Sequence, residues 1–344
     1  MSAPVTFNAS WLMKQEFPPV KYVVPGIIPE GMTLLVAAPK IGKSWMVLGL
    51  GLELSNGGHA FGSIAVGKPR PVLYLALEDG QRRLQDRLLK LNPSDVSHRL
   101  EFITSVGDAK VIDIISEYML RHDGLDPVVI LDTLGKVMPP AAGNQSAYGH
   151  DYKMLSALKA TSDAVPGSSL VIVHHTNKGE KGDFLDAVSG TQGIAGAADT
   201  VLVLKRDRQD KAATLQVTSR DAEEGEYAME MNDGSWELKG ADLAAAAQAA
   251  QTAKQTDGVG DRMADVIEKV GEFPEGIKPQ DLAVLMQLDY KSAQVYLSRA
   301  YESGRVNRPH RGVYTPVVSV GSVGFSSQNN TTNTNNTPLE GVEP

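Results

Sequence analysis

The chain has 344 residues, with 33 basic against 41 acidic side chains and a net charge of −8 at pH 7. At roughly 150 residues per domain, this length predicts about two domains. The lack of cysteine in the sequence excludes disulfides, thiolate metal sites and cysteine nucleophiles.

Apolar runs in the sequence are short. The longest, such as residues 72–78, are far below the roughly 20 residues of a membrane helix. The N-terminus also lacks the basic-then-apolar order of a signal peptide. We therefore expect a cytoplasmic protein without a membrane partner. The negative net charge argues against bulk binding to polyanions, although a local basic surface is compatible with it.

Changes in composition divide the sequence into five expected segments. They are an N-terminal arm (1–24), an α/β domain (25–240), a linker (241–257), a small helical domain (258–317) and a disordered tail (318–344). The linker is rich in alanine and glutamine and is equally compatible with a helix. The tail contains NNTTNTNNT, which has no apolar side chain to bury.

The α/β domain alternates short β-rich runs with helical stretches, a pattern typical of a parallel sheet. We expect strands over residues 33–37, 72–78, 101–106, 128–132, 169–175 and 199–206. Their central residues are apolar almost throughout, as in strands that are covered on both faces. Residues 213–220 and 226–240 are expected to add a hairpin or edge strands to this sheet.

The strongest motif is AAPKIGKSW (37–45), which matches the phosphate-loop pattern G-x-x-x-x-G-K-[ST] except that Ala37 replaces the first glycine. A strand precedes the motif and a helix follows it, which is the context for binding an anion with backbone N–H groups and argues against a chance GKS turn. Lys43 is expected to reach the β- and γ-phosphates of ATP, and Ser44 to ligate Mg²⁺. The expected nucleotide contacts are Ala38, Pro39, Lys40, Ile41, Gly42, Lys43, Ser44 and Trp45.

Chemically active side chains end three other expected strands. Glu78 and Asp79 follow one strand, Asp132 ends the next, and His174 and His175 end a third. Because ligands bind beyond the carboxyl ends of parallel strands, we expect these groups near the phosphate loop. Asp132 would then hold Mg²⁺ and Glu78 would act as general base on water, whereas Asp79 fits an acid at a helix N-terminus. A histidine could bond the γ-phosphate, and a buried structural histidine is the alternative.

These strand ends, together with PGIIPEGMTLLVAAPKIGKS (25–44) and SGTQGIAGAADTVLVLKR (189–206), resemble the RecA/DnaB-like ATPases. Within that group the sequence looks most like the RepA-type hexameric helicases of plasmids and phages, over roughly residues 20–240. The resemblance implies a RecA-like core, ATP and Mg²⁺ as ligands, and an N-terminal arm that packs on a neighbouring subunit. It implies that Lys43 binds phosphate, that Ser44 and Asp132 bind Mg²⁺, and that Glu78 activates water. It also implies that His175 is a sensor and that Gln192 is a second reporter of the γ-phosphate. The polarity of an ordinary loop explains Gln192 equally well.

The ATPases that this sequence resembles complete each site with an arginine from the adjacent subunit. Arg206, which ends the run LVLKR, and Arg220, in TSRDAEEGE, are the two candidates. Either arginine could instead simply cover the surface. The true finger is expected to contribute about 10³–10⁵-fold to turnover.

Residues 258–317 have the pattern of three helices and two short strands, which predicts a winged helix-turn-helix. The residues expected to face its core are Met263, Val266, Ile267, Val270, Leu282, Leu285, Met286, Ala293, Leu297, Ala300 and Tyr301. One acid, Glu302, stands against five cations in the third helix and the strands, namely Lys291, Arg299, Arg305, Arg308 and Arg311. A helix in the major groove with a wing on the DNA backbone would need this excess of positive charge, although winged helices also bind proteins.

The sequence as a whole predicts an ATP-hydrolysing, homo-oligomeric motor that works as a ring or filament on DNA. The RepA-type resemblance implies a hexameric ring on single-stranded DNA in plasmid or phage replication. Two polar loops, 135–150 and 178–186, are expected to face the DNA, with Lys136, Lys178 and Lys181 as phosphate contacts. One alternative is a recombination or loading ATPase that does not unwind DNA. Another is a DNA-binding replication initiator or regulator in which the bound nucleotide serves only as a switch.

Overall fold

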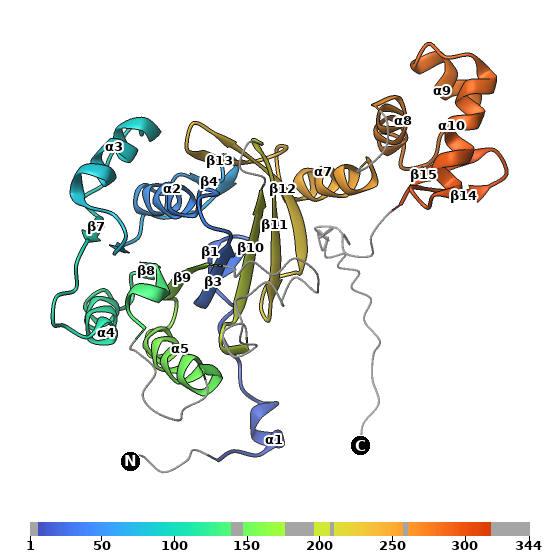
Figure 1. The fold of residues 1–344 in the computed structure, drawn as a ribbon. Coiled ribbons are helices and arrows are strands. Elements are labelled where there is room, and N and C mark those ends of the chain that lie inside the picture. The colour runs from blue at the N-terminus through green and yellow to red at the C-terminus, as the bar shows by residue number, and fades with distance from the viewer. Residues whose placement is uncertain (1–5, 139–146, 176–195, 207–209, 257–260, 318–344) are drawn as a thin grey trace, which may run out of the picture.

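The centre of the fold is a nine-stranded sheet with the strand order β13-β12-β11-β10-β3-β9-β8-β6-β7 (Figure 1). The computed structural model describes residues 6–138, 147–175, 196–206, 210–256 and 261–317. Three candidate site residues and the expected tail lie outside the described residues, namely Lys178, Lys181, Gln192 and 318–344.

Six neighbouring strands of the sheet are parallel. In spatial order they are β10 (Thr200–Arg206), β3 (Gly31–Ala37), β9 (Ser169–His175), β8 (Val128–Asp132), β6 (Val72–Ala76) and β7 (Leu100–Ile103). Alternate side chains of β3 enter two separate cores, with Leu35 and Ala37 in one and Leu34 and Val36 in the other. Burial on both faces explains why the strands read as nearly continuous apolar runs.

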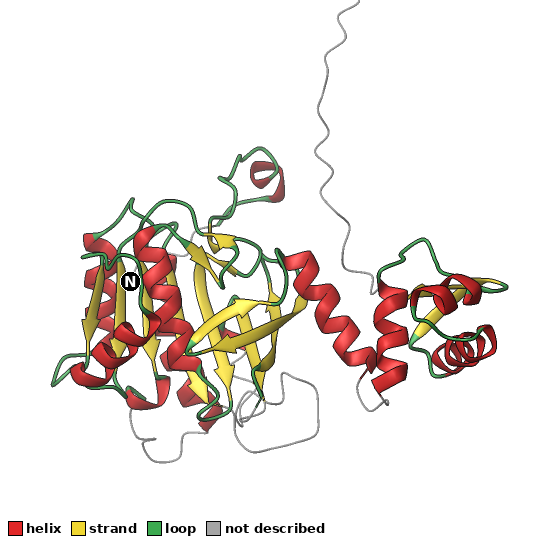
Figure 2. Cartoon of the chain, turned by 90° about the horizontal axis from the view of Figure 1, so that it is seen from above, coloured by secondary structure: helices red, strands yellow, loops and turns green. Residues whose placement is uncertain are grey.

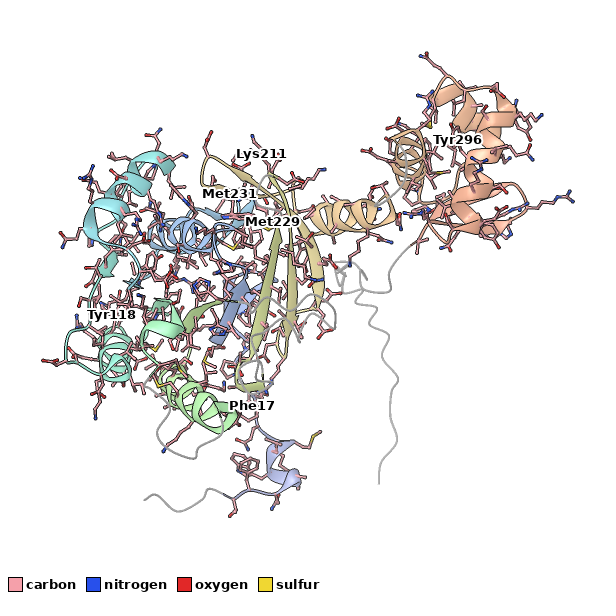
Figure 3. All side chains as sticks on the ribbon, viewed as in Figure 1. Phe17, Tyr118, Lys211, Met229, Met231 and Tyr296 are labelled. Atoms are coloured by element: carbon pink, nitrogen blue, oxygen red, sulfur yellow. The ribbon has the colours of Figure 1, made fainter. Side chains whose placement is uncertain are left out.

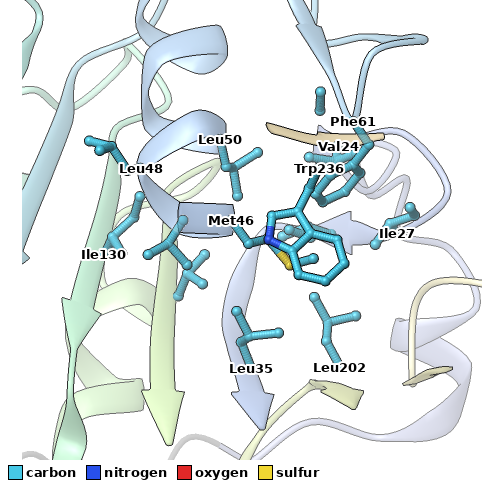
Figure 4. Close-up of a cluster of buried hydrophobic side chains, with 14 of the residues drawn as sticks. Val24, Ile27, Leu35, Met46, Leu48, Leu50, Phe61, Ile130, Leu202 and Trp236 are labelled. Carbon is cyan, nitrogen blue, oxygen red and sulfur yellow. The ribbon is translucent and has the colours of Figure 1, made fainter. Parts of the chain in front are cut away.

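Helices cover both faces of this sheet (Figure 2). Its first face packs against α2 (Lys43–Asn56) and α3 (Gln81–Leu91). The second packs against α4 (Val111–Arg121) and α5 (Ala147–Asp163). Figure 4 shows the first core, in which side chains of α2 lie over those of the central strands. The predicted α/β fold with a mainly parallel sheet is thereby confirmed.

The other edge of the sheet is antiparallel. It consists of β11 (Ala212–Ser219), β12 (Gly225–Asn232) and β13 (Ser235–Leu238). The run 226–240 was expected as one element, but it forms two strands. Its turn is Asp233-Gly234, with φ angles of 49° and 100°, and Asp-Gly is a favoured pair in two-residue hairpin loops.

The N-terminal arm is shorter than the sequence suggested. It contains one short helix, α1 (Ala9–Leu12), and then exposes apolar side chains such as Phe17 (Figure 3). β1 (Tyr22–Val24) pairs with β2 (Ile28–Pro29), and Val24 is fully buried in the first core. The last residues of the expected arm therefore belong to the α/β core. A further small hairpin, β4 (His59–Ala60) and β5 (Ile64–Ala65), follows α2.

The segment expected as a linker is mostly a helix. This helix, α7 (Leu243–Thr256), packs on β12 and buries Ala246 and Ala250. Small alanine side chains allow the helix to lie close to the strand. The segment therefore extends the core instead of forming a free tether, and it leads to the remaining helices (Figure 1).

The C-terminal unit (residues 261–317) has its own hydrophobic core. Its elements are α8 (Asp261–Gly271), α9 (Pro279–Leu285), α10 (Tyr290–Glu302), β14 (Val306–His310) and β15 (Val313–Pro316). Leu285 and Tyr301 were expected in this core but are 50% and 46% exposed. Ala283 takes the inward position beside Leu282 in α9, and Tyr301 lies at the edge of the buried stripe of α10. None of the described helices combines the length and the apolar character needed to cross a membrane.

Candidate nucleotide-binding site

The phosphate loop (residues 37–45) connects β3 to α2, as the motif predicted. β3 ends at Ala37 and α2 begins at Lys43. Gly42 has a left-handed φ of 105°, and a Cβ at this position would lie 3.0 Å from the sulfur of Met231. The backbone angle therefore requires glycine there, and a Cβ would also be in tight contact with the Met231 side chain.

The Lys43 ammonium is buried and has three polar contacts inside the protein. Its Nζ donates to the carbonyl oxygens of Ala37 at 2.7 Å and Ala38 at 2.9 Å, and it lies 2.9 Å from Nδ1 of His175. These contacts use all three ammonium hydrogens. Burial lowers the pKa of Lys43 to about 8, against the opposing effect of two nearby carboxylates. A phosphate that binds Lys43 must therefore replace at least one of these contacts.

His175 lies between Lys43 and Glu78. Because its Nδ1 accepts from the ammonium, the ring proton is placed on Nε2, which lies 3.7 Å from Oε1 of Glu78. The same carboxylate oxygen accepts a hydrogen bond of 3.2 Å from Oγ1 of Thr133. The ends of β9, β6 and β8 thus meet beside the phosphate loop, in the arrangement expected from the sequence.

Asp132 ends β8 inside the protein, with only 1% of its surface exposed. Its Oδ2 accepts a hydrogen bond of 2.8 Å from the hydroxyl of Tyr74, whereas Oδ1 is buried without a hydrogen-bond partner in the described part of the chain. Burial raises the pKa of Asp132, and the hydroxyls of Ser44 and Tyr74 oppose that rise. Mg²⁺ prefers oxygen ligands of this kind, so the unpaired carboxylate oxygen and the Ser44 hydroxyl fit the predicted metal site.

Two side chains form a wall against the phosphate loop that the sequence did not predict: Arg206, at the end of β10, and Trp236, in the antiparallel strand β13. Nε1 of Trp236, in β13, donates a hydrogen bond of 3.0 Å to the carbonyl oxygen of Gly42. Nη1 of Arg206 donates one of 3.2 Å to the carbonyl oxygen of Ile41, and its guanidinium carbon lies 5.8 Å from the Trp236 ring. The backbone of the phosphate loop is thereby held by two side chains from outside the motif.

Trp236→Phe tests this wall. Phenylalanine removes the donor to Gly42 and also some apolar volume of a buried side chain, so we expect the free energy of unfolding to fall by at least about 1 kcal/mol. Urea unfolding of both proteins would measure the change. Trp11→Phe is the matched control, because Trp11 lies exposed on the arm, outside the phosphate loop. Equal unfolding midpoints for wild type and Trp236→Phe would show that the bond contributes nothing.

Trp45, the last residue of the motif, lies beneath a group of cations. The Arg87 guanidinium carbon and the Lys90 ammonium are 5.4 and 5.6 Å from the centre of its ring. Arg87 also forms an ion pair with the buried carboxylate of Asp79, as does Arg83. The sequence suggested an acid at a helix N-terminus here. Asp79 lies directly before Gly80, the N-cap residue of α3, and it pairs with two arginines of that helix instead of capping it.

The two candidate finger arginines lie at opposite ends of the strands, Arg206 on the side of the phosphate loop and Arg220 on the other side. Arg206 contacts the phosphate loop of its own chain. Arg220 follows Ser219, which pairs with Thr200 next to Thr33 near the start of β3. Its side chain is 62% exposed and forms a 3.6 Å ion pair with Asp199. Of these two arginines, therefore, Arg206 is the one that reaches the phosphate loop within a single chain.

The expected DNA contacts are distributed over two regions of the described chain. Lys136 is exposed at the end of the short helix η1 (Leu134–Lys136), while residues 147–150 of the loop expected at 135–150 belong to α5. In the C-terminal unit, Arg308 and Arg311 line a common pocket. Lys291 and Arg299 are exposed on α10. Arg305 differs from them, because it hydrogen-bonds the carbonyl oxygen of Gln255 in α7.

Comparison with known proteins places this fold in a family. The AAA_25 family model, described as an AAA domain, matches residues 2–181, just over half of the chain. The chain belongs to the AAA_25 family. No curated protein matches the sequence significantly. Family membership, the phosphate loop and the parallel sheet of this AAA_25 protein together support a P-loop ATPase with a RecA-like core.

Solved structures with a similar fold include a DnaB-like replicative helicase described in its interactions with primase. It shares 13% sequence identity over 66% of this AAA_25 chain and 66% of its own, with a TM-score of 0.50. The RadB recombinase shares 13% identity over 62% of this chain and 91% of its own, with a TM-score of 0.44. A KaiC-like protein from the archaeon Pyrococcus horikoshii shares 12% identity over 64% of this chain and 100% of its own, with a TM-score of 0.43. At 13% identity, the helicase supports the fold assignment alone.

Proposed function

We propose that this protein is an ATP-hydrolysing motor on single-stranded DNA that works as a hexameric ring, like the RepA-type helicases that its sequence resembles. The observation that carries the proposal is the continuous set of contacts from Lys43 through His175 and Glu78 to Thr133. This set joins a phosphate-binding group to a carboxylate suited to activate water. Ser44 and Asp132 would hold Mg²⁺, which when bound neutralises charge on the phosphates.

In this proposal Glu78 orients the attacking water and accepts its proton. The carboxylate is exposed to solvent and accepts a hydrogen bond from Thr133 on one side. His175 acts as the sensor. When Lys43 binds a phosphate, it gives up its contact with Nδ1 of His175 and the imidazole becomes free to move. The contact between Nε2 of this ring and the Glu78 carboxylate then changes with the state of the phosphate.

The proposed finger is Arg220, acting on the site of an adjacent subunit. Arg206 is less suited to act across an interface, because it already holds the Ile41 carbonyl of its own loop. Arg220 is exposed at the opposite end of the strands, where its 3.6 Å ion pair with Asp199 and its 3.4 Å hydrogen bond to the carbonyl oxygen of Gly196 are both long enough to be given up readily. Exposed apolar side chains on the arm, Phe17 among them, supply a surface that would pack on the neighbouring subunit.

The C-terminal unit is the second proposed contact with nucleic acid. We infer a winged-helix module that is separate from the ATPase core, because it has three helices, a β-hairpin and a hydrophobic core of its own. Lys291, Arg299, Arg308 and Arg311 would supply its contacts to phosphate, and Lys136 would supply one from the ATPase core.

The deciding experiment measures ATP hydrolysis with and without single-stranded DNA, on the wild type and on Lys43→Ala. We expect hydrolysis that single-stranded DNA stimulates, and its loss in the variant. Strand displacement with ATP would then distinguish a helicase from an ATPase that loads another protein. Absence of hydrolysis in the wild type would overturn the enzyme assignment. Footprints on duplex DNA without DNA-stimulated hydrolysis would instead indicate a regulator in which the bound nucleotide serves only as a switch.

A further inference from the structure

A pocket of about 410 Å³ opens on the C-terminal unit. It lies between the start of α9, the first turns of α10 and the β14–β15 hairpin. The side chains that give it its chemistry are Lys278, Gln280, Tyr290, Gln294, Arg308 and Arg311. Its volume falls within the range of roughly 300–1,000 Å³ that is typical of sites for small organic groups.

The lining of the pocket is strongly cationic. Lys278, Arg308 and Arg311 contribute three positive charges, and the described residues that line it include no acid. Arg308 is held in place, because its guanidinium carbon lies 5.6 Å from the ring of Tyr314, which is itself buried. Nearby, Asp289 accepts hydrogen bonds from the backbone N–H and the hydroxyl of Ser292 at the start of α10. The pocket therefore favours an anion, and the acid that caps α10 is already engaged.

The pocket also carries an aromatic surface and two amides. Tyr290 is 54% exposed although it lines the pocket, so its ring is available to a ligand. Gln280 and Gln294 each offer both a donor and an acceptor. Cations that bind phosphate, an aromatic ring that stacks on a base and amides that bond a base edge are the groups that single-stranded nucleic acid requires.

We propose that this pocket binds one unpaired nucleotide of a single strand, with its base on Tyr290 and its phosphate near Lys278 and Arg311. A base inside a duplex cannot present its face to a tyrosine, because its neighbours in the stack cover that face. The pocket thus differs in chemistry from a helix that reads the major groove. This inference rests on the proposed association with DNA, but it does not depend on ATP hydrolysis.

The test measures binding of a fluorescent ten-nucleotide thymidine strand to the full chain by anisotropy, without ATP. Tyr290→Ala is expected to lower the affinity about tenfold, the effect of losing one stacked base, and Tyr290→Phe should retain it. Lys278→Ala and Arg311→Ala should each weaken binding and reduce its dependence on salt. Tyr301→Ala and Arg262→Ala are the matched controls, because both side chains are exposed on the same unit outside the pocket.

Further results decide between this proposal and its competitors. A strand that carries 5-iododeoxyuridine should cross-link to Tyr290 on irradiation, as peptide mass mapping would show. Unchanged affinity in Tyr290→Ala, or equal loss of binding to a duplex of the same sequence, would overturn the proposal. Competition by free thymidine monophosphate at the same concentration as the strand would make the pocket a mononucleotide site instead. Loss of hydrolysis in Lys43→Ala with strand binding intact would separate this inference from the proposed motor.

Discussion

Replacement of Arg220 with alanine is expected to lower ATP turnover by about 10³–10⁵-fold, the contribution of an arginine finger. ATP binding should remain nearly unchanged, because Arg220 lies at the end of the sheet opposite its own phosphate loop. Turnover at saturating ATP and the binding of a fluorescent ATP analogue would be measured on the same preparation. Arg206→Ala is the comparison. Because Arg206 holds the Ile41 carbonyl, its loss should weaken ATP binding and lower stability.

Mixing two variants separates an effect across the interface from an effect inside one subunit. Arg220→Ala subunits keep Glu78, and Glu78→Gln subunits keep Arg220, so a mixed ring contains some interfaces with both groups intact. We expect turnover of the mixture to exceed that of either variant alone. A mixture no more active than its components would contradict action across the interface. Wild-type turnover in Arg220→Ala would exclude this arginine as the finger.

Glu78→Gln is expected to lower turnover by about 10²–10⁴-fold, the range for removal of a general base. Glutamine keeps the size of the side chain and can still accept a hydrogen bond from Thr133, but it cannot take a proton from water. ATP binding should therefore persist, and circular dichroism should show an unchanged fold. Glu117→Gln is the matched control, because Glu117 is exposed on α4 and pairs with Arg121 of the same helix. Turnover of Glu78→Gln close to that of the wild type would remove Glu78 from the hydrolytic step.

Local sequence patterns predicted the elements of the core well, because their causes are local. β8 and β9 have the residue ranges that their apolar runs indicated, and the phosphate loop has the expected strand–turn–helix arrangement. The meeting of Glu78, Asp132 and His175 followed from one general rule about the carboxyl ends of parallel strands. That rule requires only that the strands be parallel and in one sheet.

The wall of the site could not be predicted in the same way, because it depends on the order of the strands. β10 lies next to β3 although more than 160 residues separate them in the chain, and this neighbour brings β11, β12 and β13 with it. Arg206 and Trp236 reach the phosphate loop only as a result of that order. The Asp233-Gly234 turn was the one available local signal, since Asp-Gly between two β-rich runs indicates a hairpin.

Two of the chain's three tryptophans lie at the phosphate loop: Trp45 is its last residue, and Trp236 donates to Gly42. The third, Trp11, is on the exposed arm. Indole emission changes with the polarity around the ring, so the protein carries its own optical reporters. Trp45 and Trp236 would respond to occupancy of the loop, and Trp11 to burial of the arm. With Trp11→Phe the first signal can be followed alone, and nucleotide binding can be timed against subunit assembly without an added label.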